Sequence, residues 1–96
     1  MKMLMIICPE NRRDEVQQLV ARHDIHAYSE SENVIGEGAT GKRLGTHAWP
    51  QKSILIFTVA VAEKTDELLA ALREYHKNLY PGEGLRAFTL PVESEV

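Results

Sequence analysis

The chain has 96 residues, a formal net charge of −3 at pH 7 and a single cysteine. This length predicts one domain with a modest core, and small domains of this kind often associate. The negative charge argues against a nucleic-acid-binding protein, because such proteins carry a basic face. One cysteine excludes a disulfide within the chain. Since no apolar run is long enough to span a bilayer and no signal peptide is recognisable, we expect a cytoplasmic protein.

The first third of the chain predicts a strand, a helix and a second strand. Lys2–Cys8 is apolar after its first residue and is followed by Pro9, which predicts a buried central strand. Asn11 is a candidate cap for the next element, and apolar residues at helical spacing predict an amphipathic helix from Arg12 to about His23. Residues 26–35 have a polar middle, which is typical of an edge strand or of a strand with one face in water.

The second half repeats this order. The β-branched run Ser53–Val61 is the strongest strand signal in the chain. A helix is predicted from Thr65 or Asp66 to about Asn78. Leu85–Val92 predicts a last strand, in which Pro91 indicates an edge or the end of the strand because proline cannot donate to a strand ladder. The order β-α-β-β-α-β over residues 1–96 predicts a single α+β domain with the ferredoxin-like fold, an antiparallel four-stranded sheet with two helices on one face.

The segment from Gly36 to Lys52 is the first place to look for function. It holds four of the six glycines, the only tryptophan and three basic residues. Its glycines include a literal G-x-G-x-x-G, but no helical pattern follows, so we reject a dinucleotide-binding fold. Glycine amides beside Lys42, Arg43 and Lys52 can still hold an anion. Trp49 is as consistent with an anchor for a partner as with a side chain that pins the loop to the domain.

Other kinds of site have weaker support. No pair of histidines has a metal-binding spacing, although a site between subunits involving Cys8 or His47 stays open. Cys8 in an apolar strand is more typical of an inert core thiol than of a nucleophile. No catalytic triad or pair of carboxylates stands out, so we expect a protein that is not an enzyme. If the chain did hydrolyse a bound nucleotide, the groups able to position water would be Glu37, Glu83 and His47.

These features together resemble the PII signalling family, specifically its short PII-like branch, over most of residues 1–92. Val34–Gly38 is similar to the V-x-G-x-G segment at the start of the family's T-loop, and Pro81–Gly84 with Arg86 is similar to the G-x-G-K of its B-loop. The apolar strand ending at Cys8 and Lys52 before the third strand add to the likeness. PII-like proteins are ferredoxin-like homotrimers that bind adenine nucleotides between subunits and contact a partner through the T-loop.

The resemblance implies a role for each candidate residue. Three would line the base and ribose side, namely Gly36, Glu37 and Gly38. Those expected to hold phosphates are Gly82, Glu83, Gly84 and Arg86, with Lys52 adding charge. The ones expected to face a partner are Lys42, Arg43 and Trp49. The chain departs from the family pattern at Leu85, where the B-loop lysine would stand, and its loop lacks the tyrosine of the nitrogen regulators.

These departures favour ADP, AMP or a cyclic nucleotide over ATP with 2-oxoglutarate. Our leading hypothesis is a homotrimeric sensor with no obligatory cofactor and an adenine nucleotide as effector. Its partner would be a membrane transporter or another regulated protein. Because ordering a glycine-rich loop costs backbone entropy, we expect residues 36–52 to be disordered without ligand and ordered with it. The alternatives are a divalent-metal-binding or metal-tolerance protein of the same fold and a nucleotide-hydrolysing enzyme.

Overall fold

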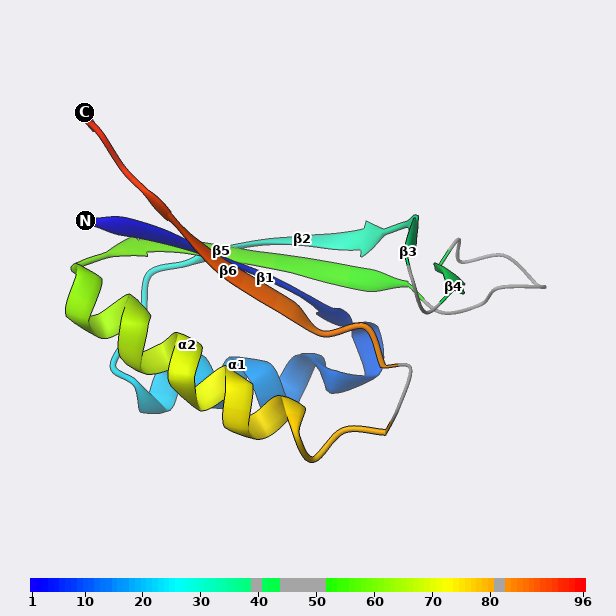
Figure 1. The fold of residues 1–96 in the computed structure, drawn as a ribbon. Coiled ribbons are helices and arrows are strands. Elements are labelled where there is room, and N and C mark those ends of the chain that lie inside the picture. Colours follow the sequence, from blue (N-terminus) through cyan, green and yellow to red (C-terminus); the bar gives the residue numbers. More distant parts are fainter. Residues whose placement is uncertain (39–40, 44–51, 81–82) are drawn as a thin grey trace.

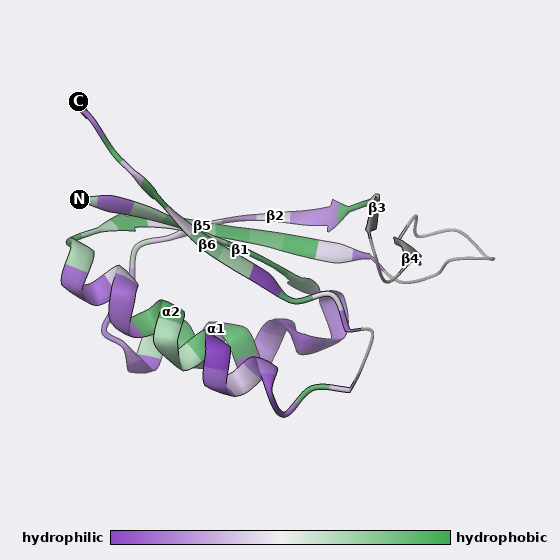
Figure 2. Ribbon diagram, in the orientation of Figure 1, coloured by the Kyte–Doolittle hydropathy of each residue, from purple (hydrophilic) through white to green (hydrophobic). Residues whose placement is uncertain are grey.

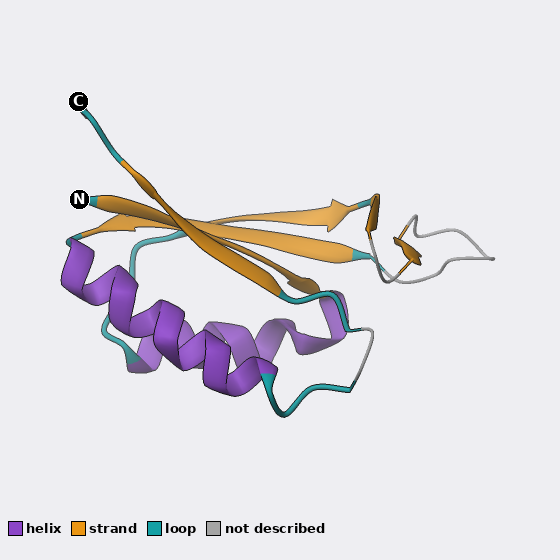
Figure 3. Cartoon of the chain, in the orientation of Figure 1, coloured by secondary structure: helices purple, strands orange, loops and turns teal. Residues whose placement is uncertain are grey.

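The structure is a computed structural model that describes residues 1–38, 41–43, 52–80 and 83–96. Four strands form one antiparallel sheet in the order β2-β5-β1-β6, and both α-helices lie on the same side of it (Figure 1 and Figure 3). The predicted ferredoxin-like fold is therefore confirmed. In chain order the elements are β1 (Lys2–Pro9), the 3-10 helix η1 (Glu10–Arg12), α1 (Arg13–Arg22), β2 (Ser29–Val34), β3 (Gly36–Gly38), β4 (Gly41–Arg43), β5 (Ser53–Ala60), α2 (Ala62–His76) and β6 (Arg86–Pro91).

One predicted helix start and one predicted helix cap are wrong. The second helix begins at Ala62, because the carbonyl of the extended Val61 already accepts the amides of Lys64 and Thr65. Thr65 is fully buried, and its hydroxyl donates to the carbonyl of Ala62 at 3.0 Å, inside the first turn. Asn11 does not cap the first helix, since it lies within η1 and no side chain caps either η1 or α1.

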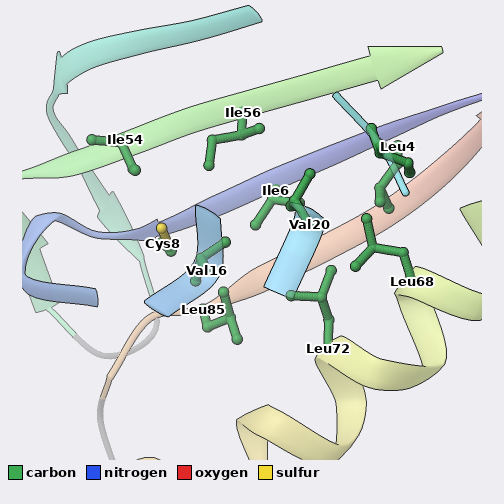
Figure 4. Close-up of a cluster of buried hydrophobic side chains, with 11 residues drawn as sticks. Leu4, Ile6, Cys8, Val16, Val20, Ile54, Ile56, Leu68, Leu72 and Leu85 are labelled. Atoms are coloured by element: carbon green, nitrogen blue, oxygen red, sulfur yellow. The ribbon is translucent and has the colours of Figure 1, made fainter. Parts of the chain in front are cut away.

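The core lies between the sheet and the helices (Figure 4). Alternation along β1 and β5 directs every second side chain to the helices. Burial raises the pKa of the Cys8 thiol to about 12, with the charge of Glu30 adding to the effect, so this thiol stays protonated at neutral pH. The core side chains are Leu4, Ile6, Cys8, Val16, Val20, Ile25, Ile54, Ile56, Leu68, Leu72 and Leu85.

The opposite side of the sheet is also apolar. Figure 2 shows β1 and β5 hydrophobic along most of their length, whereas the edge strand β2 is largely hydrophilic. Because side chains alternate, half-buried and exposed residues of β1, β5 and β6 make up this side. Within the described part of the chain, no helix covers it (Figure 1). We call this surface the open face; its residues are Met3, Met5, Ile7, Leu55, Phe57, Val59, Phe88 and Leu90.

The segment that connects β2 to β5 contains regular structure at its start. β3 and β4 pair as an antiparallel ladder, with Gly36 opposite Arg43 and Gly38 opposite Gly41. The sequence predicts a long glycine-rich loop here and does not identify these two short strands. Trp49 lies outside the described residues, so the expected ordering of this segment on ligand binding stays a prediction. None of the described helices is long and apolar enough to cross a membrane.

Candidate functional site

Both candidate segments lie at one end of the sheet. Pro9 at the end of β1 pairs with Ser53 at the start of β5, and Ser53 also pairs with Val34 at the end of β2. Arg86 at the start of β6 pairs with Ile7. However, β2 and β6 are the two outer strands, so three strand spacings of about 4.8 Å put their edges roughly 14 Å apart. Within the described residues of one chain, the two predicted halves of the site therefore lie at opposite edges of the sheet.

Lys52 closes the base of the 36–52 segment. Its ammonium donates to the Asn33 side-chain oxygen at 3.2 Å, and its carbonyl accepts the Glu10 amide at 3.0 Å. Asn33 has a φ of 58°, in the left-handed region that asparagine tolerates, where the β2–β5 register shifts. A Cβ added at Gly36 would meet nothing within 4 Å, so the backbone there is open to a ligand. Lys52 thus links the end of the 36–52 segment to Asn33 and Glu10. Its expected role toward phosphates stays a prediction.

Arg86 extends the open face with a positive charge. Its register partner Ile7 belongs to that face, and alternation puts Arg86 on the same side as Phe88. The Arg86 side chain is exposed and makes no hydrogen bond or ion pair with another described residue. An open cavity of about 230 Å³ lies beside Arg86, between α2 and β6. The residues lining this cavity are Leu69, Leu72, Arg73, His76, Leu85, Arg86 and Ala87.

Glu83 belongs to the turn before β6, but its carboxylate is already bound. Arg12 donates to it from Nε at 2.9 Å and from Nη2 at 3.1 Å, and the Tyr80 amide donates to it at 2.9 Å. Its side chain is only 15% exposed. The carboxylate therefore shapes the turn. The nearby Gly84 is half-buried, and Gly82 lies outside the described residues.

Arg12, Glu15 and Tyr75 were not anticipated from the sequence. Arg12 Nη1 donates to Glu15 at 3.2 Å, and the Tyr75 hydroxyl donates to the same carboxylate. The bond from Tyr75, followed by that from Arg12, holds the pKa of Glu15 below its ordinary value. Burial and the bond to Glu15 raise the pKa of Tyr75, and the bond to Glu83 raises the pKa of Arg12. The network ties η1, both helices and the turn together.

Arg13 reaches the other candidate segment. Its Nη2 lies 2.6 Å from Glu30 and 2.9 Å from Glu32, both on β2. Gln17 donates to Glu30 at 2.7 Å, which fixes that carboxylate against α1. A weak sequence signal for these contacts existed, because two arginines at a helix start oppose the helix dipole and are favoured there only when carboxylates pair with them.

A second cavity, of about 510 Å³, lies between η1 and the end of β2. Three carboxylates line it against a single arginine, so it does not suit a phosphate. Its lining residues are Glu10, Asn11, Arg13, Asp14, Glu32, Asn33 and Ile54. The described residues hold no group of three His, Cys, Asp or Glu side chains placed to bind a metal. Nothing is described for the side chains of Glu37, Lys42 and Arg43, and His47 lies outside the described residues.

The class of this protein follows from these observations. It is a ferredoxin-like domain with a glycine-rich segment between the second and third strands of the sheet and a glycine turn before the last. The chain belongs to the nitrogen regulatory protein P-II family, whose model matches residues 1–96. The predicted relationship to PII-like proteins is thereby confirmed. A search of curated proteins finds no significant match.

Solved structures of PII-like proteins share the fold. CPII from Thiomonas intermedia K12, bound to ADP, AMP and bicarbonate, matches with a TM-score of 0.76 and 20% identity, over 93% of this chain and 82% of that one. Its apo form matches with a TM-score of 0.66 and 16% identity, over 95% and 89%. A PII-like signalling protein from Thermus thermophilus gives 0.69 and 20%, over 93% and 83%.

Proposed function

We propose that this chain is a homotrimeric PII-like regulatory protein that binds an adenine nucleotide, ADP or AMP, between its subunits. Binding would be reported to a partner, proposed to be a membrane transporter, through residues 36–52. Support for the ligand comes from the fold shared with CPII, which has been solved with ADP and AMP bound. Support for the location comes from this chain's own residues.

The open face is the observation that carries the proposal. Its strand register forms continuous apolar rows, Phe57–Met5–Phe88 and Val59–Met3–Leu90. Exposed apolar surfaces of this kind mark interfaces, because leaving them in water is unfavourable. In the next row, Ile7 lies between Leu55 on β5 and Arg86 on β6, so this row ends in a positive charge. Assembly on this face would bring Arg86 against a neighbouring subunit, where a nucleotide phosphate could bind.

The sheet order gives a second reason for a site between subunits. Residues leading to Gly36 leave the β2 edge, while the turn that contains Glu83 precedes the β6 edge. In a cyclic assembly, contacts are head-to-tail, so unlike edges of neighbouring copies meet. Two half-sites that are separated within one protomer would then face each other across the interface.

We propose the nucleotide as an effector and not a substrate. Of the groups able to position water, Glu83 accepts a bidentate pair from Arg12, and a carboxylate held in this way is a poor base. The test is to incubate the protein with ATP or ADP and to measure product by chromatography. Turnover that persists in purified protein and disappears in Glu37→Gln or His47→Ala would favour an enzyme instead.

Sedimentation and calorimetry test the proposal as a whole. We expect a trimer of three 10.8 kDa chains, about 32 kDa. We also expect a melting temperature that rises with ADP or AMP, since a ligand at 100 times its dissociation constant stabilises by about 2.7 kcal/mol. Emission of Trp49, the only tryptophan, should shift on binding. A stable monomer that ignores every nucleotide would refute the proposal. A response to divalent metals alone would favour the metal-binding alternative.

A further inference from the structure

The turn before β6 has an anchor far away in the sequence. The Arg12 guanidinium donates two bonds to the Glu83 carboxylate, at 2.9 and 3.1 Å, across 71 residues of chain. This parallel fork is the geometry in which arginine and carboxylate pair most specifically. The side chains are 21% and 15% exposed, so water screens the pair less than it screens an ordinary surface ion pair.

Glu83 also holds the turn together internally. Its carboxylate accepts the Tyr80 amide at 2.9 Å, and its own amide donates to the Tyr80 carbonyl at 3.1 Å. The Leu85 amide donates to the Glu83 carbonyl at 3.0 Å, and the buried Leu85 leads directly to Arg86. The position of Arg86 at the edge of the open face therefore depends on a turn whose central carboxylate is held by Arg12.

We propose that Arg12 is a positioning residue for nucleotide binding. It acts through Glu83, which fixes the backbone from Glu83 to Leu85 and thus the placement of Arg86, without touching the ligand. Glu15 holds the far side of the Arg12 guanidinium at 3.2 Å, and Tyr75 of α2 holds Glu15. Arg12 is thereby fixed against both helices. This inference rests on the proposed function, because it concerns the affinity of that same site.

A purely electrostatic role makes the opposite prediction for one variant. If Arg12 only neutralised Glu83 beside a phosphate, then Glu83→Gln would remove a repulsive charge and tighten ADP binding. If the fork positions the turn, Glu83→Gln keeps the shape of the side chain but breaks the charged pair, and ADP binding weakens. Whether Glu83→Gln tightens or weakens ADP binding therefore distinguishes the electrostatic role of Arg12 from the positioning role.

The experiment combines hydrogen exchange of the nucleotide-free protein with calorimetric titration of ADP. In Arg12→Ala and Glu83→Gln we expect faster exchange of the Glu83 and Leu85 amides. We also expect the affinity for ADP to fall by about tenfold. This is the loss expected if about one molecule in ten keeps the turn in the conformation that binds. Arg12→Lys should fall between wild type and Arg12→Ala, because lysine cannot form the fork. The double variant should bind no worse than either single variant, since both changes break one contact.

Two variants serve as controls. Arg13→Ala removes the neighbouring arginine, whose contacts are to Glu30 and Glu32, and should leave exchange at Glu83 and Leu85 unchanged. Lys2→Ala breaks the exposed pair between Lys2 and Asp66 at the other end of the sheet and should leave ADP affinity unchanged. Melting curves check that each variant is folded.

The outcomes that overturn the inference are distinct. Exchange at Glu83 and Leu85 that is equal in wild type and Arg12→Ala shows that Arg12 does not hold the turn. Faster exchange with unchanged ADP affinity, or tighter binding by Glu83→Gln, shows that the turn is not what limits binding. A wild-type protein that binds no adenine nucleotide removes the proposed function and, with it, the role of Arg12 toward a ligand. In that case the exchange results still report separately whether Arg12 holds the turn.

Discussion

Replacing Phe88 by alanine tests whether the open face is a subunit interface. Phe88 is 40% exposed and pairs across the sheet with Met5. A phenylalanine presents roughly 200 Å² when fully accessible, so about 80 Å² remains for a neighbour to bury. At about 25 cal/mol per Å², this contributes up to about 2 kcal/mol per subunit and about 6 kcal/mol per trimer. The trimer association constant should therefore fall by up to about four orders of magnitude.

The assay is sedimentation equilibrium over a range of concentrations from nanomolar to micromolar. We expect Phe88→Ala to populate monomer at concentrations where wild type is trimeric, while its circular dichroism stays native because Phe88 lies outside the core. Tyr28→Ala is the control, since Tyr28 is also 40% exposed but precedes β2 and does not belong to the apolar rows. If Phe88→Ala and Tyr28→Ala both sediment as wild type at every concentration, the open face is not the interface.

Three further predictions follow from particular side chains. Arg86→Ala and Lys52→Ala should each weaken ADP binding by roughly 1.5–3 kcal/mol in calorimetry, the range for a hydrogen bond to a charged group, and unchanged binding in both would put the site elsewhere. The Tyr75 hydroxyl lowers the pKa of Glu15 from its ordinary 4.5, so stability gained from this carboxylate is present above pH 4.5 and lost as pH falls through the lowered value. The melting temperature of Tyr75→Phe should therefore fall less than that of wild type when the pH is lowered below 4.5. Equal falls in the two proteins would contradict this. The Cys8 thiol, with its pKa raised to about 12, should react with a thiol reagent at neutral pH only after denaturation, and rapid labelling of native protein would show that it is accessible.

The fold was predictable because its signals are local. The apolar run of β1 and the β-branched run of β5 are each read from consecutive residues, and in the structure these strands occupy the centre of the sheet. The polar middle of residues 26–35 correctly indicated an edge strand, which is β2. The start of α2 was missed because Thr65 is a common capping residue. In this helix it is buried in the first turn, where packing and not capping decides its place.

The geometry of the candidate site was predictable only in part, because it depends on pairs distant in sequence. Glycines marked the two segments, and Arg86 could be singled out from its place after the Gly82–Gly84 turn. That Arg86 shares a side of the sheet with Phe88 follows from the register with Ile7, which no local pattern reveals. The partner of Glu83 is likewise 71 residues away, so its carboxylate could not be assigned from the turn alone.

The junction after β1 explains how one short segment reaches both edges of the sheet. Arg12, the last residue of η1, has φ −105° and ψ 4°, outside the α-helical region, whereas Arg13 begins α1. The backbone therefore changes direction between two adjacent side chains, and they diverge. Arg12 pairs with Glu83 before β6, and Arg13 pairs with Glu30 and Glu32 on β2. Edge strands have neighbours on one side only and are the least restrained part of a sheet. Anchoring both edges to the segment that follows the central strand would therefore hold the two proposed half-sites in place on a small domain.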